Sequence, residues 1–445
     1  MDATTSPAFA DHLKQLQQRW ERALTNTGYD LALVSAGVST PYLFDDQSPP
    51  FRPNPHFAQW FPQRESEHCE LIIKPGATPT LLFFSPQDYW HLPPSQPDWA
   101  ASHFDVRSFD SVEALARARS DALAGYNNIA HISGAPLAAG GTQHNPADLI
   151  AEVDYLRARK TAFEIANLRA STTRGVAGHL AAQEAFANGL SEYDIFMAFI
   201  GATRHTAGEL PYHPIVALNS HAGVLHYQHY DQSPPAQAFS FLIDAGATEC
   251  GYASDITRTY AGAAAPAAFG ELIKGLDQVQ QTLINTIQVG DNYETLHRSL
   301  IDGLADLLCG VGVFRCSTSQ AQELQLADPF MPHGLGHLIG LQTHDVGGHQ
   351  STAAGDRVAP NPRFPALRLT RDLELDSVFT IEPGIYFIPS LLAQLKDSPN
   401  KDLIDWTLIE ELMPCGGIRI EDNVWLSQQG PVNLTRDAFH AASQE

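Results

Sequence analysis

The sequence contains few cysteines, and none of them are paired at a metal-binding spacing. Five cysteines are scattered through 445 residues without a CxxC motif. A sparse, odd-numbered set argues against a disulfide framework and against a cysteine-ligated zinc site. The sequence therefore gives no support to either class.

Long apolar runs and a basic leader are also missing. No stretch of about 18 apolar residues occurs, so we expect no membrane span. The first residues, Met1 to Thr5, have neither the basic start nor the apolar core of a signal peptide. We therefore expect a cytoplasmic protein without a membrane partner.

Positive charge is scarce as well. The chain has 27 Lys and Arg against 50 Asp and Glu, a formal net charge of −23. Such a chain is repelled overall by the phosphates of nucleic acid and by anionic membranes, so we expect no nucleic-acid partner. An acidic excess also fits plain solubility, so the choice of function depends on specific residues.

The first third of the chain alternates between helical and strand-like patterns. Residues 13–24 have the periodicity of an amphipathic helix, and four short apolar runs bounded by Gly or Pro indicate buried strands. These runs are residues 31–34, 71–73, 81–84 and 129–132. Alternation of this kind predicts an α/β domain over residues 1–155. The proline-rich stretch 49–55 must be a loop, either a connector or an arm that reaches a neighbouring surface.

The remaining residues, 156–445, predict an α+β domain. Helices are expected within 148–187 and near 265–287 and 293–308, while short strands separated by glycine follow residue 210. A change in composition near 390–405 suggests an exposed insertion.

Four short motifs in the second domain carry carboxylates or histidines. An apolar strand ends at Asp244 before a glycine, and a second strand follows Asp255; if the strands pair as a hairpin, the two carboxylates can lie side by side. The segment from His333 to Asp345 has three histidines among glycines, which let the backbone approach a ligand closely. Glu382 ends an apolar run before Pro383. Each motif alone also fits a structural role.

The fourth motif places Arg419 and Glu421 on one face of a strand. Taken in order, DAG, SD, HGLGH, TIEPG and GIRIED resemble the metal-dependent pita-bread peptidases, which include methionine aminopeptidases, aminopeptidase P and prolidase, the Xaa-Pro dipeptidase. The resemblance covers residue 165 to the C-terminus. The preceding domain fits the proline-directed members, and length and layout are most similar to the bacterial Xaa-Pro dipeptidases.

The resemblance implies a role for each matching residue. Two divalent ions would be held by five side chains, with Glu382 also serving as general base. The implied metal ligands are Asp244, Asp255, His337, Glu382 and Glu421, with Asp255 and Glu421 as bridges. His333 and His344 resemble catalytic, substrate-facing histidines. The implied substrate-binding residues are His226, Tyr212, Arg368 and Arg419; the last could instead orient Glu421, and Arg368 could also be an ordinary surface arginine.

The ligand chemistry agrees with these roles. Four carboxylates and one imidazole are mostly hard donors, which suit Mn²⁺ and also accept Co²⁺ or Zn²⁺. The implied reaction is hydrolysis of the Xaa-Pro bond of a dipeptide by a metal-bridging hydroxide. The alternatives are an aminopeptidase P that acts on longer Xaa-Pro peptides and a non-catalytic pita-bread binding protein. A homodimer is expected, in which an arm near Phe57 and Trp60 could close the partner's site.

Overall fold

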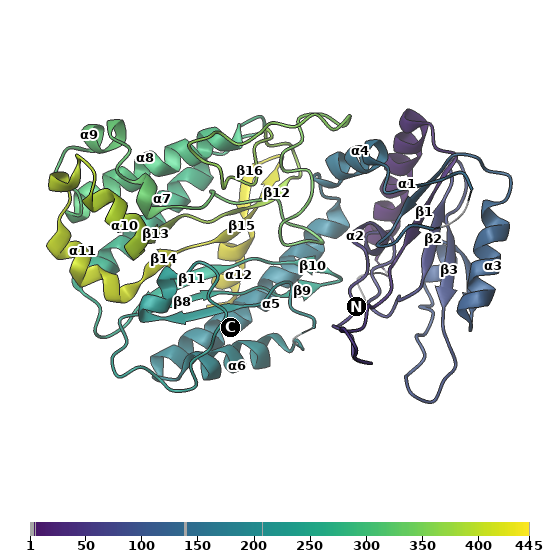
Figure 1. The fold of residues 1–445 in the computed structure, drawn as a ribbon, viewed down its shortest axis with the longest axis horizontal. Helices are drawn as coiled ribbons and strands as arrows, with labels where there is room; N and C mark the ends of the chain where they lie inside the picture. The colour runs from purple at the N-terminus through teal and green to yellow at the C-terminus, as the bar shows by residue number, and fades with distance from the viewer. Residues whose placement is uncertain (1–3, 5, 138–139, 207, 445) are drawn as a thin grey trace. The chain divides into compact units, whose positions relative to one another are not determined.

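The computed structural model describes residues 4, 6–137, 140–206 and 208–444, which form two compact units (Figure 1). The N-terminal unit comprises Met1–Asn167 with the short segments Cys250–Tyr252 and Thr352–Asp356. The C-terminal unit comprises the rest of the chain. In the described part of the chain, no helix combines the length and apolar character that crossing a membrane requires.

The N-terminal unit is built on one mixed sheet with the strand order β4-β3-β2-β1-β5-β6. Its central strand β1 pairs antiparallel with β2 and parallel with β5. The strands are β1 (Leu31–Ser35), β2 (Glu70–Ile73), β3 (Thr80–Phe84), β4 (Asp105–Phe109), β5 (Ile129–Ile132) and β6 (Thr142–His144). The helices are α1 (Pro7–Thr27), α2 (Pro55–Ala58), α3 (Val112–Leu123) and α4 (Ala147–Arg157).

The sequence patterns predicted this unit correctly. The four expected strands correspond to β1, β2, β3 and β5, and the expected helix lies within α1, which begins where the Ser6 hydroxyl accepts a hydrogen bond from the Phe9 backbone. Leu33, Leu82 and Leu115 belong to a buried cluster that joins the sheet to α3. The stretch 49–55 is irregular until Pro55, which begins α2.

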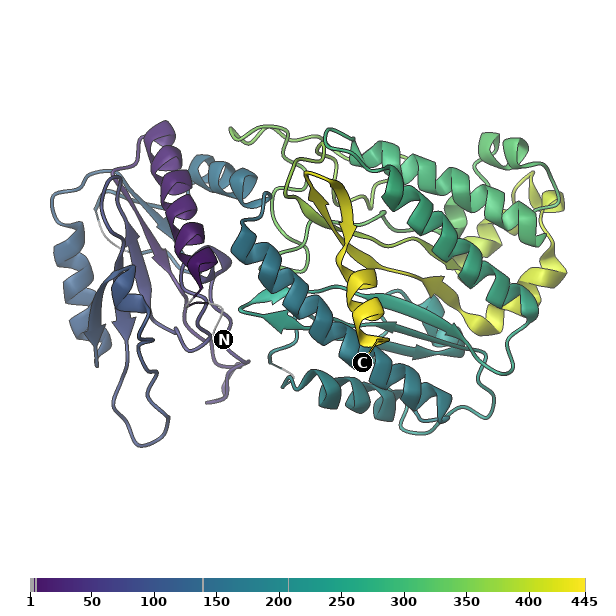
Figure 2. The same ribbon diagram turned by 180° about the vertical axis from the view of Figure 1, so that it is seen from behind.

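The C-terminal unit contains small sheets between two layers of helices (Figures 1 and 2). The longest sheets have the orders β11-β8-β7 and β12-β15-β16. The strands are β7 (Ile215–Leu218), β8 (Ser240–Asp244), β9 (Thr248–Glu249), β11 (Thr257–Ala261), β12 (Val378–Ile381), β13 (Gly384–Tyr386), β14 (Gly417–Arg419), β15 (Asp422–Ser427) and β16 (Gly430–Asn433). The short strand β10 (Tyr252–Ala253) begins in the N-terminal unit and ends in this one.

Helices α5 and α6 cover one side of these strands, and α7 and α8 cover the other (Figures 1 and 2). The helices are α5 (Ala162–Ala187), α6 (Glu192–Thr203), α7 (Ala267–Thr286), α8 (Tyr293–Val311), α9 (Thr318–Glu323), α10 (Pro389–Lys396), α11 (Trp406–Leu412) and α12 (Leu434–Ala442). The helices expected within 148–187 and near 265–287 and 293–308 are therefore present. The sheets therefore lie between paired helices, which agrees with the expected pita-bread architecture (Figures 1 and 2).

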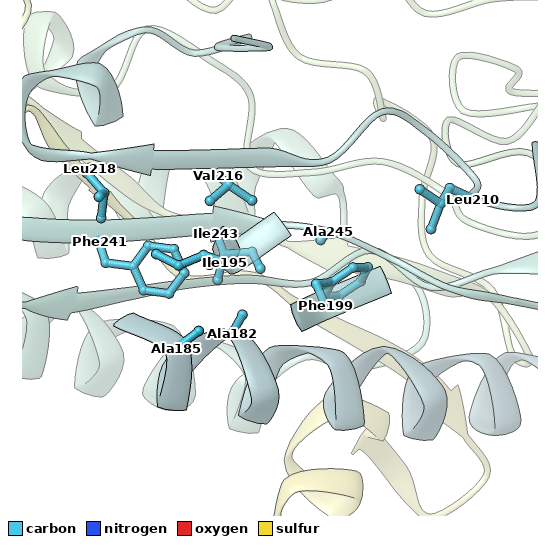
Figure 3. Close-up of a cluster of buried hydrophobic side chains, with 10 residues drawn as sticks. All are labelled: Ala182, Ala185, Ile195, Phe199, Leu210, Val216, Leu218, Phe241, Ile243 and Ala245. Atoms are coloured by element: carbon cyan, nitrogen blue, oxygen red, sulfur yellow. The ribbon is translucent and has the colours of Figure 1, made fainter. Parts of the chain in front are cut away.

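Figure 3 shows how the strand that ends at Asp244 is held. Phe241 and Ile243 of β8 point toward Ile195 and Phe199 of α6, in a cluster of fully buried apolar side chains. Because successive strand residues face opposite sides, the same strand presents its other face to the interior of the unit. The carboxylate of Asp244, at the end of this strand, is therefore attached to a well-packed part of the backbone.

The segment 390–405 is largely exposed, as its composition predicts. It nevertheless forms the regular helix α10, which buries Leu392 and Leu395, and α11 begins directly after it.

Candidate metal centre

Asp244 and Asp255 come from two neighbouring strands. Strands β8 and β11 pair antiparallel as expected, but the residue opposite Asp244 is Thr257. Asp255 lies two residues earlier, just before β11, because the short strands β9 and β10 separate the pair. The Tyr212 hydroxyl donates a hydrogen bond of 2.6 Å to Asp255 Oδ1 and holds that carboxylate in place.

Glu382 and Glu421 face each other across an interrupted ladder. Ile381 pairs with Asp422, and Gly384 pairs with Arg419, both antiparallel. The same register, carried through the gap between these pairs, sets Glu382 opposite Glu421. Like charges directly opposite each other destabilise a sheet, so this placement needs a compensating positive charge.

His337 points its Nε2 atom at three of these carboxylates. Its Nδ1 lies 3.0 Å from the Leu338 carbonyl oxygen and therefore donates its proton there. In the neutral ring Nε2 then carries a lone pair. That atom is 3.4 Å from Asp255 Oδ2, 3.8 Å from Glu382 Oε1 and 4.0 Å from Glu421 Oε1. Electron-rich atoms converge on one point, which only a proton or a cation can stabilise.

A glycine permits this approach. A side chain at Gly336 would collide with the Thr380 carbonyl oxygen and the Tyr293 hydroxyl. The tight packing places His337 directly beside β12, where its backbone N–H donates to the Thr380 hydroxyl. The glycines of the HGLGH motif thus serve close backbone approach, as the sequence indicates.

The pKa values of these groups reflect the burial of several like charges close together. Burial raises the pKa of Glu421 well above its usual value, and Asp255 and Glu382 raise it further. Burial likewise raises the pKa of Glu382 to about 7. The pKa of Asp244 is also raised, chiefly by burial, although Arg419 opposes the shift. Burial alone would lower the pKa of His337, but its contact with Asp255 raises it. A divalent cation would relieve all four shifts.

Arg419 supports the carboxylates from behind. Its Nη2 donates to Asp244 Oδ2 at 2.7 Å, its Nη1 to the Tyr386 hydroxyl at 2.8 Å, and its Nε to Thr257 Oγ1 at 3.2 Å. Thr257 in turn donates to Glu421 Oε2 at 2.8 Å. The guanidinium, expected among the substrate-binding residues, is therefore turned toward Asp244 and buried. The supporting Thr257 and Tyr386 were missed, although both lie within or beside the motifs.

Further histidines surround the carboxylates. His333 Nδ1 faces the Gly334 carbonyl at 2.8 Å, so its Nε2 accepts from Tyr386, at 2.9 Å. His344 stands edge-on to His337 with ring centroids 4.4 Å apart. Burial, His337 and the guanidinium of Arg368 lower the pKa of His344 to about 4.

His226 is the third histidine of this group, with His333 and His344. Its charge would act on both His333 and His344, and its side chain is exposed. His333 also lines a cavity of about 90 Å³, together with His297, Met331, Phe364 and Leu367. Of the sequence-predicted substrate residues, Tyr212 therefore contacts the carboxylate of Asp255, whereas His226 and Arg368 lie near enough to His344 to lower its pKa.

The donor set fits divalent cations. Asp255, His337 and Glu421 offer ligand atoms that all lie within 4.8 Å of one another. The Oδ1 atom of Asp244 is buried and has no hydrogen-bond partner in the described structure. Buried carboxylate oxygens without donors are costly, and hard oxygen ligands suit Mg²⁺, Mn²⁺ and related ions. The residues present can hold a metal centre.

Comparison with known proteins agrees with this interpretation. Residues 166–428 match the model of metallopeptidase family M24, and residues 7–155 match the N-terminal domain of Xaa-Pro dipeptidase. The chain belongs to metallopeptidase family M24. This metallopeptidase is 42% identical over 439 residues to the Xaa-Pro dipeptidase of Stenotrophomonas maltophilia and 41% identical over 440 residues to that of Xanthomonas campestris, with 98% of both chains covered in each case.

The fold of this metallopeptidase is shared with solved structures. Aminopeptidase P from E. coli with the inhibitor Pro-Leu superposes with a TM-score of 0.73 at 23% identity, covering 96% of this chain and 99% of the other. Zn-substituted E. coli aminopeptidase P in complex with product gives a TM-score of 0.72 at 23% identity, covering 96% and 98%. At this identity the likeness shows the fold alone. The M24 chain is thus a hydrolase with an N-terminal α/β domain and a pita-bread domain.

Proposed function

We propose that this metallopeptidase is a dinuclear Xaa-Pro dipeptidase, with both ions held by Asp244, Asp255, His337, Glu382 and Glu421. The convergence of His337 Nε2 with the oxygens of Asp255, Glu382 and Glu421 carries this proposal. Two divalent ions, when bound, would lower the pKa of a shared water and polarise the scissile carbonyl.

The substrate is a dipeptide with C-terminal proline. The relatives that share 41–42% identity over nearly their full length are named Xaa-Pro dipeptidases, which supports this choice. His226, His333 and His344 would face the peptide, and Tyr212 would line its pocket. The guanidinium of Arg368 suits bidentate capture of the free carboxylate that only a substrate's last residue carries.

Glu382 acts as the general base. Its pKa of about 7 before metal binding shows how strongly burial and neighbouring carboxylates favour a proton at this atom. Glu382 takes the proton of the attacking water and passes it to the proline nitrogen. That nitrogen has no hydrogen in the substrate, so it must be protonated as the C–N bond breaks. The neutral His333, whose pKa burial lowers to about 3, would not compete for this proton.

The site should bind Mn²⁺, with Co²⁺ and Zn²⁺ as substitutes, because four of the five ligands are hard carboxylates.

The test is to remove metal with a chelator and to measure hydrolysis of Gly-Pro together with bound metal. We expect activity to be lost and then restored by Mn²⁺ at two ions per chain. Full activity in metal-free protein would exclude the mechanism, and absence of any bound metal would favour a non-catalytic binding protein.

Comparison of Ala-Pro with Ala-Pro-Ala tests the substrate length. Cleavage of the dipeptide alone supports a dipeptidase, whereas preference for the tripeptide indicates an aminopeptidase P activity. We also propose a cytoplasmic homodimer and a domain boundary between residues 155 and 156. Phe57 and Trp60 are buried within the N-terminal unit, so an arm that closes the partner's site would be formed by the proline-rich stretch before them and not by these two side chains. Analytical ultracentrifugation tests the homodimer, cell fractionation the location and limited proteolysis the domain boundary.

A further inference from the structure

A glutamine of helix α7 is buried beside the metal centre. Gln280 has no exposed surface, although a primary amide carries two donor hydrogens and an acceptor oxygen. An amide that is buried without partners destabilises the folded state, so its contacts must be accounted for. All of its polar atoms are in fact bonded.

The two ends of the Gln280 amide have opposite partners. Nε2 donates to the carbonyl oxygens of Ile381 at 2.8 Å and Ile420 at 3.1 Å. Oε1 accepts from Gln281 Nε2 at 2.9 Å and from Arg436 Nη2 at 3.0 Å. A flipped amide would place oxygen against two carbonyls and hydrogen against two donors. The orientation of the amide is therefore fixed by its surroundings.

The two carbonyls belong to the residues immediately before Glu382 and Glu421. One amide group thus joins the backbone of both glutamates that face each other across the ladder. Its two hydrogens are fully used by this link, so neither Asn, with its shorter side chain, nor Glu, without the two donors, could replace it.

The link lies where the ladder lacks one of its own hydrogen bonds, although Ile420 N still donates to the Pro383 carbonyl oxygen at 3.1 Å. Pro383 has no N–H to donate. The backbone N–H of Glu382 instead donates to the Leu335 carbonyl at 2.8 Å, and that of Glu421 donates to the Thr257 carbonyl at 3.0 Å. Both amides are therefore committed to other segments. Because Pro383 cannot donate back to Ile420, the Gln280 amide supplies the donor that the Ile420 carbonyl lacks at this point of the ladder.

We propose that Gln280 is a positioning residue, which fixes the separation of Glu382 and Glu421 by clamping the peptide groups before them. The inference rests on the proposed metal-binding function. Two opposed carboxylates repel each other. Between the pairs Ile381–Asp422 and Gly384–Arg419, the ladder keeps one backbone bond, from Ile420 N to the Pro383 carbonyl. A clamp at both backbones keeps them at the spacing that shared ions need, as supporting groups outside a metal's ligand set commonly do.

The test uses Gln280→Met, which keeps length but removes both donors, and Gln280→Glu, which keeps shape and places oxygen against the carbonyls. Metal-free full-length protein is titrated with Mn²⁺ by calorimetry, and the electron paramagnetic resonance spectrum is recorded at two equivalents. We expect both variants to bind Mn²⁺ about 10–100-fold more weakly than wild type. The spectrum of a coupled Mn²⁺ pair should be altered, since the coupling depends on the separation of the ions.

Two control variants lie on the same helix. Leu276→Ala removes a fully buried side chain one turn earlier and should lower the melting temperature without changing Mn²⁺ affinity. Gln278→Met makes the same chemical change as Gln280→Met, at an exposed position whose amide bonds only Thr282, and should change neither property. These controls separate a specific clamp from a general loosening of α7.

Wild-type affinity and spectrum in a folded Gln280 variant would overturn the inference, as would an equal loss of affinity in Leu276→Ala. If one Gln280 variant fails to fold, the other provides the measurement. The proposed function fails separately, since in that case wild-type protein itself would bind no Mn²⁺ pair.

Discussion

Two clusters of carboxylate and imidazole groups in the C-terminal unit are similar in composition but differ in their hydrogen bonds. Glu192, His221 and Asp231 offer ligand atoms within 4.8 Å of one another, as do Asp255, His337 and Glu421. By proximity alone, either cluster could hold a cation. The hydrogen bonds already present within each cluster distinguish them.

In the first cluster the carboxylate of Glu192 is saturated. Its oxygens accept from four donors of one segment, all within 2.9 Å: Leu218 N, His221 Nδ1, Tyr227 OH and Asp231 N. A carboxylate with that many donors has little left to give a metal. Glu192 therefore anchors the segment that carries His226.

In the second cluster, acceptors face acceptors. His337 Nε2 is aimed at three carboxylates, and the pKa values of Glu382 and Glu421 are raised by burial and by their neighbours. The comparison teaches that a metal site is marked by acceptor atoms that face one another without a donor between them. Closeness of the residue types is not sufficient.

The largest effect is expected at Glu382, the proposed base of the second cluster. Glu382→Gln cannot accept the proton of the attacking water, so kcat for Gly-Pro should fall by about 10²–10⁴-fold. Metal content must be measured in the same preparation, because Glu382 is also a proposed ligand. Unchanged turnover with both ions bound would remove Glu382 from the chemistry.

Glu192→Gln tests the first cluster. In the wild type these donors meet a carboxylate, whereas the amide of the variant would turn its own hydrogens toward some of them. The free energy of unfolding should therefore drop by about 3 kcal/mol. Bound Mn²⁺ should stay at the wild-type level, as measured by metal analysis alongside chemical denaturation. Loss of metal from a folded Glu192→Gln protein would break the distinction between the clusters.

The sequence predicted the second cluster better than the first for a physical reason. Asp244, His337 and Glu382 lie at strand ends or between glycines, and such local features are visible as motifs. His221 gives no local signal, although its Nδ1 bonds the buried Glu192. That contact spans 29 positions, and no spacing rule reaches so far.

The same limit applies to the supporting groups of the metal centre. Gln280 contacts the carbonyls of Ile381 and Ile420, more than 100 positions away along the chain. On the helix it is one more polar residue among several glutamines. Likewise, the pairing of β8 and β11 was predictable, but the residue opposite Asp244 was not, because the register depends on the chain between them.

A buried imidazole outside both clusters sharpens the criterion further. His297 Nδ1 has no hydrogen-bond partner in the described structure, like Asp244 Oδ1, but its ring packs edge-on against Phe364 at 4.4 Å. Burial lowers the pKa of His297 to about 4. We therefore interpret its unpartnered atom as a cost of burial.

That interpretation predicts a specific acid sensitivity. With a pKa near 6.5 unfolded and about 4 folded, His297 takes up protons in the unfolded chain first. Its contribution to stability is thus complete above pH 6.5 and is lost as the pH falls toward 4, amounting to about 2 kcal/mol by pH 5. His297→Leu should remove this part of the pH dependence in denaturation curves recorded from pH 7 to 5. Curves of wild type and variant that stay parallel would contradict it.

The smallest effect is expected from a comparison of two arginines. Arg419 is saturated by Asp244, Tyr386 and Thr257, whereas Arg368 is exposed near His344. Because the Arg419 guanidinium is already hydrogen-bonded and that of Arg368 is exposed, we expect Arg368 to be the arginine that binds the substrate. Arg368→Ala should raise KM for Gly-Pro about tenfold, roughly 1.4 kcal/mol, and leave kcat nearly unchanged. For Gly-Pro amide, which lacks the free carboxylate, the variant should match wild type. Equal changes for both compounds would mean that Arg368 does not recognise the carboxylate. Arg363→Ala serves as the matched arginine control, because it breaks an ion pair with Asp328 instead.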